Sequence, residues 1–163
     1  MILIGVGSNL PSPKFGTPLQ TGEAALAELR RRGITVSRQS RWYESAPVPI
    51  SDQPWFVNAV AAVETDLSPE ALLSLVHEIE AEFGRVRRTR DEARILDLDL
   101  LVYNDLVSQR PPVLPHPRMH QRSFVLLPLA ELVPGWRHPV SGESIEQLIA
   151  ALASDQIARP MRG

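Results

Sequence analysis

The order in which short β-branched segments and longer amphipathic segments follow one another is the strongest constraint on how this chain folds. Short apolar or alternating runs indicate strands, and apolar residues three and four positions apart indicate helices. Clusters of glycine and proline separate the segments. The expected elements are, in order, a strand over residues 1–6, a helix over 19–32, strands over 34–43 and 56–64, a helix from 68 to 84 and a strand over 95–103.

The second of these helices has the clearest start in the sequence, at Ser68-Pro69-Glu70. Serine can cap a helix, proline is tolerated at the first helical position, and glutamate suits the positive end of the helix dipole. The next residues place apolar side chains on one face of a helix, and Gly84 ends it. The apolar residues are Leu72, Leu75, Val76, Ile79 and Phe83.

The succession strand, helix, strand, strand, helix, strand is that of a split βαββαβ unit. We therefore expect an α+β fold, a ferredoxin-like sandwich with a βαββαβ core and helices on one face of an antiparallel-containing sheet. Extra C-terminal helices are expected over residues 121–132 and 144–153. The length of 163 residues fits one domain spanning 1–163. Because this fold hosts many activities, function has to be argued from the site.

Composition excludes several classes of protein. The net charge of −2 provides no overall field toward nucleic acid or membrane. The lack of cysteine rules out a disulfide framework and a thiolate metal site. The apolar start, residues 1–6, is too short for a signal peptide or a membrane span. We therefore expect a cytoplasmic monomer that acts on small molecules and binds neither nucleic acid nor membrane.

Two carboxylates in the strand over 95–103 are the sharpest chemical feature. Residues two apart in a strand point to the same face, so Asp97 and Asp99 should lie together while leucines fill the other face. Adjacent carboxylates repel unless a cation lies between them, and magnesium prefers oxygen ligands. The alternative is a strand with a solvated acidic face.

An arginine cluster stands directly before this strand. Five arginines lie between Arg85 and Arg94, and arginine grips phosphate with a planar fork of donors. The cluster could instead be a solvated basic loop. Magnesium and arginine side by side are, however, what phosphoryl transfer requires, and this combination favours a catalytic site.

Two further segments offer groups for binding a ligand. A proline-rich loop delivers His116 and Arg122, and Phe124 opens the next helix. Asn58 carries both donors and an acceptor, which suits the edge of a planar heterocycle, and Phe56 and Phe124 could stack on its faces. The alternative is that both phenylalanines belong to the core.

These motifs together resemble the hydroxymethyldihydropterin pyrophosphokinase family. The resemblance covers residues 2–139, and the motifs occur in the order and nearly at the spacing of the family. They are Gly7-Ser8-Asn9-Leu10, Asp52-Gln53-Pro54 with Asn58-Ala59, Gly84-Arg85-Val86-Arg87, Asp97-Leu98-Asp99, and Pro115-His116 with Arg122-Ser123-Phe124.

The resemblance implies a magnesium-dependent enzyme of folate biosynthesis. It would transfer pyrophosphate from ATP to the hydroxymethyl group of 6-hydroxymethyl-7,8-dihydropterin and release AMP. Asp97 and Asp99 would bind two magnesium ions, and Arg85 and Arg94 would stabilise charge during transfer. The residues implied for ATP binding are Glu80, Arg87, Arg90, His116 and Arg122. Those implied for pterin binding are Ser45, Pro47, Val48, Phe56, Asn58 and Phe124, with the two phenylalanines sandwiching the ring and Asn58 reading its edge.

The chain departs from the family pattern in the arginine cluster. Members usually carry Arg-Trp-Gly-Pro-Arg before the aspartates, whereas this chain has Arg90-Asp91-Glu92-Ala93-Arg94. The tryptophan that helps to close the pocket in the family is therefore missing, and the acidic residues Asp91 and Glu92 stand in this stretch instead. The departure leaves the two aspartates untouched.

Three other functions are compatible with parts of the sequence. An RNA-binding module of the same fold would need exposed aromatic residues on its central strands, where this chain has leucines and aspartates. A nucleotidyltransferase also pairs Gly-Ser with Asp-x-Asp, but usually close together in sequence. A catalytically weakened paralogue that only binds pterin or nucleotide would account for the altered arginine segment.

Overall fold

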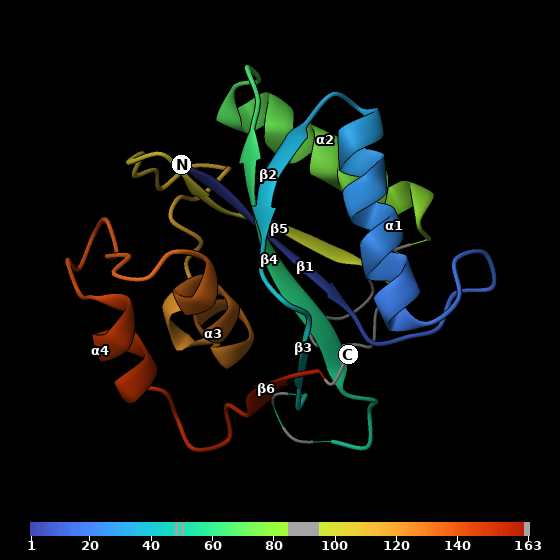
Figure 1. The fold of residues 1–163 in the computed structure, drawn as a ribbon. Helices are drawn as coiled ribbons and strands as arrows, with labels where there is room; N and C mark the ends of the chain where they lie inside the picture. Colours follow the sequence, from blue (N-terminus) through green and yellow to red (C-terminus); the bar gives the residue numbers. More distant parts are fainter. Residues whose placement is uncertain (48, 50, 85–94, 162–163) are drawn as a thin grey trace.

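The structure, a computed structural model, describes residues 1–47, 49, 51–84 and 95–161. Within these ranges it has six strands and four α-helices (Figure 1). The strands are β1 (Ile2–Ser8), β2 (Thr35–Gln39), β3 (Tyr43–Ser45), β4 (Phe56–Glu64), β5 (Asp97–Tyr103) and β6 (Ala158–Pro160). The helices are α1 (Pro18–Arg31), α2 (Pro69–Glu82), α3 (Ser123–Leu132) and α4 (Ile145–Ala150), and a 3₁₀ turn covers Met119–Gln121. The fold is α+β, as expected.

All six strands join one antiparallel sheet. Its order is β5-β1-β4-β3-β6, and β2 also pairs with β4. The first strand of the chain, β1, therefore lies between β4 and β5. Gly7 is opposite Asn58 on one side and Asp97 on the other, so residues far apart in sequence share one row of the sheet.

Helix α2 begins where the sequence predicts. Ser68 is its N-cap, with an Oγ that accepts a hydrogen bond from the Ala71 N–H at 3.1 Å, and Pro69 occupies the first helical turn. Leu72, Val76 and Ile79 are buried along one face. The cap and the apolar spacing thus fix the position and the rotation of α2 over the sheet.

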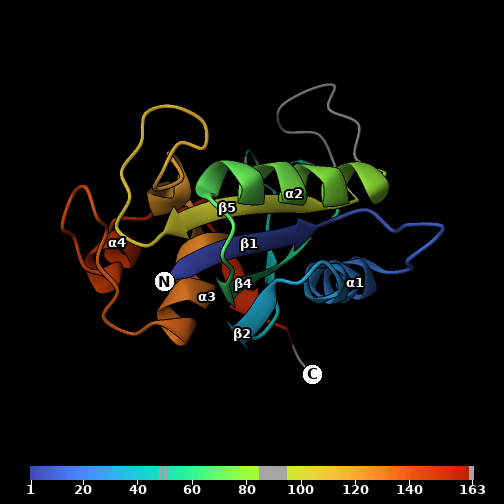
Figure 2. The ribbon, with the colours of Figure 1, turned by 90° about the horizontal axis from the view of Figure 1, so that it is seen from above.

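The two helices of the expected βαββαβ unit cover one face of the sheet, and the extra helix α3 covers the other, which the sequence did not predict. Helices α1 and α2 pack on one face, and α3 packs on the other (Figures 1 and 2). The reason lies in β4, where residues of both parities are buried: Ala61 and Val63 join the first core, and Val60 and Ala62 join the second. A strand that is apolar on both faces needs a layer on each.

Three boundaries also differ from the sequence reading. The strand expected over 34–43 is interrupted after Gln39 and becomes two strands, β2 and β3. At the interruption the Oγ of Ser40 accepts a hydrogen bond from the Val60 N–H. The helix expected from 121 begins at Ser123, after the 3₁₀ turn, and the helix expected over 144–153 is the shorter α4. Strand β6 was not anticipated, since three residues that include Pro160 give no periodic signal.

No helix in the described part of the chain is long and apolar enough to cross a membrane.

Candidate active site

Asp97 and Asp99 lie on the same face of β5, as their spacing predicts. Leu98 and Leu100 are buried in the core under α1 and α2, so the two carboxylates point to the opposite face, the one that α3 partly covers. Both aspartates are only partly exposed. The strand therefore presents two neighbouring carboxylates beyond the edge of the α3 layer.

Two glycines of β1 lie beside the aspartates. Gly5 is opposite Asp99 and Gly7 is opposite Asp97, on the same face. A Cβ atom at position 7 would lie 2.9 Å from Oδ1 of Asn58, closer than normal packing allows. Glycine is needed at position 7 because the Asn58 amide occupies the space of a side chain. The middle of this face is thus bare backbone between β5 and β4.

On the other side of the glycines, β3 and β4 present a polar pair. Asn58 Nδ2 donates to Ser45 Oγ at 2.7 Å, and both residues are almost fully buried. Phe56 is opposite Ser45 on the same face and is partly exposed. Pro47 is buried just beyond β3. An oriented amide and a phenylalanine therefore face the aspartates across the glycine strip.

A further residue ties this end of the sheet together. Asn9 Nδ2 donates to Gln53 Oε1 at 3.3 Å and to the carbonyl of Pro54 at 3.2 Å, and Asn9 is fully buried. The bonds fasten the segment after β1 to the segment that leads into Phe56. The sequence placed Asn9 and Gln53 in motifs without giving either one a role, and only the long-range contact reveals it.

The proline-rich loop brings His116 to the aspartates. The His116 N–H donates to the carbonyl of Leu101 at 2.8 Å, which holds the loop on β5. Burial, helped by the charges of Arg122 and Arg118 and opposed by that of Asp97, lowers the pKa of His116 to about 4. The ring is therefore neutral at neutral pH. Its Nδ1 accepts a hydrogen bond from the Arg118 N–H, so the remaining proton is on Nε2 and can be donated.

Arg122 completes the cluster. Its Nη1 lies 3.8 Å from Oδ2 of Asp99, and its guanidinium lies 5.4 Å from the centre of the Phe124 ring. Arg122 is the N-cap residue of α3, so the start of that helix sets the positions of both side chains. Phe124 is partly buried against the α3 core. The structure thus joins His116, Arg122 and the aspartate pair, with Phe124 beside them.

Glu80 lies on the other side of β5. It is buried on α2, and its Oε2 accepts a hydrogen bond from the Leu98 N–H at 2.8 Å. Helix α2 covers the face opposite Asp97 and Asp99, so Glu80 does not share their surface. The hydrogen bond between Glu80 and the Leu98 N–H holds α2 against β5.

The remaining residues named from the sequence lie outside the described residues. They are Val48, Arg85, Arg87, Arg90 and Arg94. The four arginines belong to the connection between the end of α2 and the start of β5.

The donor set of this face fits magnesium. The described residues contain no cluster of three or more histidine, cysteine or acidic groups that could enclose a metal. Magnesium usually takes only one or two carboxylates from a protein and completes its shell with water and substrate phosphates. A pair of neighbouring carboxylates meets that requirement.

This arrangement of groups is typical of an enzyme that transfers phosphate groups. It combines paired carboxylates, a neutral histidine donor and an arginine on one side with a buried amide and a phenylalanine on the other. A sequence profile described as 7,8-dihydro-6-hydroxymethylpterin-pyrophosphokinase (HPPK) matches residues 3–134. The chain belongs to this family.

Individual relatives agree over most of the chain. A 2-amino-4-hydroxy-6-hydroxymethyldihydropteridine pyrophosphokinase from Synechocystis is 41% identical over 149 residues, which cover 90% of this chain and 73% of the relative. One of the same name from Pseudomonas aeruginosa is 39% identical over 160 residues, covering 97% and 95%. Folic acid synthesis protein fol1 from Pneumocystis carinii is 37% identical over 157 residues, 96% of this chain but 20% of that longer protein.

Proposed function

We propose that this chain transfers the pyrophosphoryl group of ATP to the hydroxymethyl group of 6-hydroxymethyl-7,8-dihydropterin, yielding AMP, in folate biosynthesis. One observation carries the proposal. In the row Asp97–Gly7–Asn58, the carboxylate that would bind the metal and the amide that would read the heterocycle lie on one face, separated only by glycine backbone. Family membership supports the same reaction.

The pterin end of the site is formed by β3, β4 and the start of α3. Asn58, held by Ser45, would read the edge of the ring through its amide. Phe56 and Phe124 would stack on the two faces of the ring. Pro47 and Val48 would line the pocket, as the family resemblance implies.

The ATP end lies along β5. Asp97 and Asp99 would hold two magnesium ions, which when bound neutralise the triphosphate and polarise it for attack. His116, neutral and with a proton on Nε2, would donate to a phosphate oxygen, and Arg122 would pair with the nucleotide. Arg87 and Arg90 are further ATP-binding residues in this proposal, and Arg85 and Arg94 would stabilise the charge of the transferring group. Glu80, which the family resemblance also implies for ATP binding, lies on the opposite face of β5 and would act on the ATP end through its bond to the Leu98 N–H.

The reaction is a displacement at the β-phosphorus of ATP. The hydroxymethyl oxygen forms a bond to the β-phosphorus. The bond between the β-phosphorus and the oxygen that bridges it to the α-phosphorus breaks, and AMP leaves with that bridging oxygen. The hydroxyl proton is released. The protein contributes mainly alignment and charge neutralisation.

The remaining proposals concern the whole protein. The strand order, with β1 between β5 and β4 and with β2 and β3 both on β4, supports a ferredoxin-like βαββαβ core to which α3, α4 and β6 are added. We take residues 1–163 as one domain, acting as a monomer in the cytoplasm on small molecules and on neither nucleic acid nor membrane. The relatives described above are named as pyrophosphokinases or as a folic acid synthesis protein, which gives no support to a paralogue that only binds.

The test is incubation of the protein with ATP, magnesium and the reduced pterin alcohol. We expect AMP and a pyrophosphorylated pterin to form in equal amounts, and AMP formation to require the pterin. ADP or pyrophosphate as the nucleotide-derived product would refute the proposal.

A further inference from the structure

Residues 156–161 contact both ends of the proposed pterin site. These residues, which we call the 156–161 segment, include β6 and lie beyond residues 3–134, the part matched by the family profile. In Figure 1 the segment runs below α3 to the edge of the sheet at β3.

One end of the segment holds the start of α3. Gln156 Oε1 accepts a hydrogen bond from the Ser123 N–H at 3.0 Å, and the Ser123 hydroxyl lies 3.4 Å away. The first N–H groups of a helix have no partner within the helix, so this side chain satisfies one of them. Ser123 stands between Arg122 and Phe124. The bond therefore fixes the turn that carries both of these side chains.

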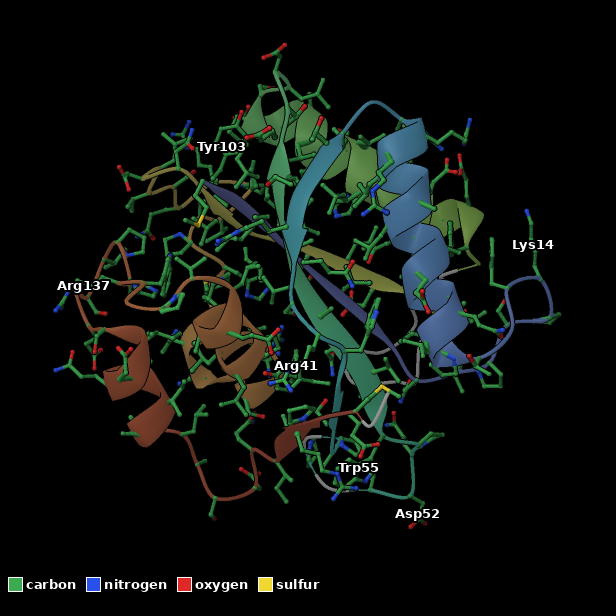
Figure 3. The ribbon with its side chains drawn as sticks, viewed as in Figure 1. Lys14, Arg41, Asp52, Trp55, Tyr103 and Arg137 are labelled. Carbon is green, nitrogen blue, oxygen red and sulfur yellow. The ribbon has the colours of Figure 1, made fainter. Side chains whose placement is uncertain are left out.

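The other end of the segment holds β3 and the residues before β4. Ala158 pairs with Ser45, and the Ala46 N–H donates to the carbonyl of Ile157 at 3.0 Å. Arg159 Nε donates to Glu44 Oε1 at 2.6 Å, and its guanidinium lies 4.8 Å from the centre of the Trp55 ring. Trp55, labelled in Figure 3, directly precedes Phe56.

The far end of α3 has a separate anchor. Glu131 Oε1 accepts hydrogen bonds from the Tyr43 hydroxyl and from Arg41 Nε, each at 2.8 Å. Figure 3 shows Arg41 beside this helix. A helix of ten residues is about 15 Å long, so the bonds of Glu131 lie far from its first turns, where Val125 and Leu126 pack into the core. Gln156 supplies the anchor at the end where Phe124 lies.

We propose that Gln156 and Arg159 are positioning residues for the pterin. Neither touches the proposed substrate. Gln156 sets the position of Phe124, and Arg159 sets that of Trp55 and hence of Phe56, so together they fix the spacing of the two rings. The inference rests on the proposed function, because the spacing matters only if a planar ring binds between the phenylalanines.

Steady-state kinetics of two substitutions at Gln156 test the inference. Gln156→Ala removes the acceptor, and we expect the KM for the pterin to rise about fivefold, the effect of one hydrogen bond. The KM for ATP should change less than about twofold, because Arg122 on the same turn is also held by its ion pair with Asp99. Gln156→Glu keeps an acceptor oxygen and places a negative charge at a helix N-terminus, which is favourable, so it should restore the wild-type KM.

Gln147→Ala is the matched control. Gln147 Oε1 accepts a hydrogen bond from the Ser144 N–H at the start of α4, an equivalent bond away from the site. It should leave both KM values unchanged. Arg159→Ala should raise the KM for the pterin, whereas Arg137→Ala, which removes an exposed arginine bonded to Gly142, should not.

The outcomes separate this inference from the proposed function. If the wild-type protein transfers pyrophosphate but Gln156→Ala leaves the KM for the pterin unchanged, the inference alone is wrong. The same holds if Gln156→Ala raises both KM values equally, or if Gln156→Glu is no better than Gln156→Ala. If the wild-type protein makes no AMP from ATP and the pterin alcohol, the proposed function fails and the inference fails with it.

Discussion

At the scale of single residues, the proposed chemistry depends first on Asp97 and Asp99. We expect Asp97→Ala and Asp99→Ala each to lower kcat by on the order of 10²–10³-fold or more, the cost of removing one group that stabilises transferring charge. Both variants should remain folded, because both aspartates are partly exposed and neighbouring carboxylates repel each other, so the loss of one removes that repulsion. Activity in magnesium and thermal melting of the metal-free protein measure the two effects.

Asp105→Ala is the control for both variants. Asp105 is exposed in the turn after β5, and its substitution should change neither activity nor melting. Near-normal turnover of Asp97→Ala or Asp99→Ala would show that the metal assignment is wrong.

The glycine at position 7 provides a second test at this scale. In Gly7→Ala the new Cβ would lie 2.9 Å from Asn58 Oδ1, so the amide has to turn away from its bond with Ser45. We expect weaker pterin binding, by about five- to tenfold, the loss of one good hydrogen bond. Calorimetric titration with the pterin in the presence of a non-hydrolysable ATP analogue measures it.

Gly5→Ala is the matched control for this substitution. Its Cβ would meet only the flexible side chain of Leu101, at 3.4 Å, which can move by a few tenths of an ångström. Pterin binding should stay within about twofold of wild type. Equal losses in the two variants would mean that the Asn58 amide does not read the pterin.

At the scale of helices and strands, an ion-pair cluster ties α1 to α2. Glu28 on α1 bonds to Arg31 and Arg32, and Arg32 reaches Glu78 and Glu82 on α2. Hydrogen bonds from Arg31 and Arg32 lower the pKa of Glu28 to about 2, from an ordinary value of 4.5. The cluster is partly exposed, and salt therefore weakens it.

The lowered pKa sets a pH window for a third prediction. Above pH 4.5 Glu28 is ionised in both folded and unfolded chains, and its ion pairs stabilise the fold. As the pH falls through about 2 the folded protein also binds the proton, and that stabilisation is lost. Glu28→Gln should therefore lower the melting temperature at pH 7 but hardly change it near pH 2. Equal shifts at both pH values in urea or thermal melts would contradict the assignment.

The same scale shows what the sequence could predict and why. The predicted bounds of helix α2 and of strands β4 and β5 lie within about two residues of the observed ones. A serine cap followed by proline, and long apolar runs, are local signals. The shared face of Asp97 and Asp99 follows from strand periodicity alone. Strand β6 and the anchors at Glu131 and Gln156 depend on contacts between residues 33 or more positions apart, which no local pattern encodes.

At the scale of the whole molecule, one sheet serves two cores. Leu29 is fully buried in the core under α1 and α2, and Leu129 is fully buried in the core under α3. Neighbouring residues of β1, such as Leu3 and Ile4, enter different cores. Neither core can open without disturbing the strands of the other. The two should therefore unfold as one cooperative unit, which would support a single domain.

Leu29→Ala and Leu129→Ala provide the fourth prediction. Each should lower the free energy of unfolding by about 2–5 kcal/mol, the usual cost of a cavity in a core. Both should still show one transition. Trp42 packs against the first core and Trp136 against the second, so variants that retain only Trp42 or only Trp136 of the three tryptophans report on each side separately. If, for Leu29→Ala or Leu129→Ala, the unfolding midpoint reported by Trp42 differs from that reported by Trp136, the chain consists of two units that unfold independently.

The location of the 156–161 segment also affects the order in which the protein is completed during synthesis. Strand β1 emerges from the ribosome before the other strands of the sheet, but it gains its neighbour β5 only once residues 97–103 have emerged. Strands β1 to β5 and every proposed catalytic group are made before Gln156 and Arg159. A nascent chain stalled between α4 and β6 would carry the first five strands and the aspartates, while the Ser123 N–H still lacked its bond to Gln156. The contacts that position the two phenylalanines are therefore completed only after residues 156–161 have emerged.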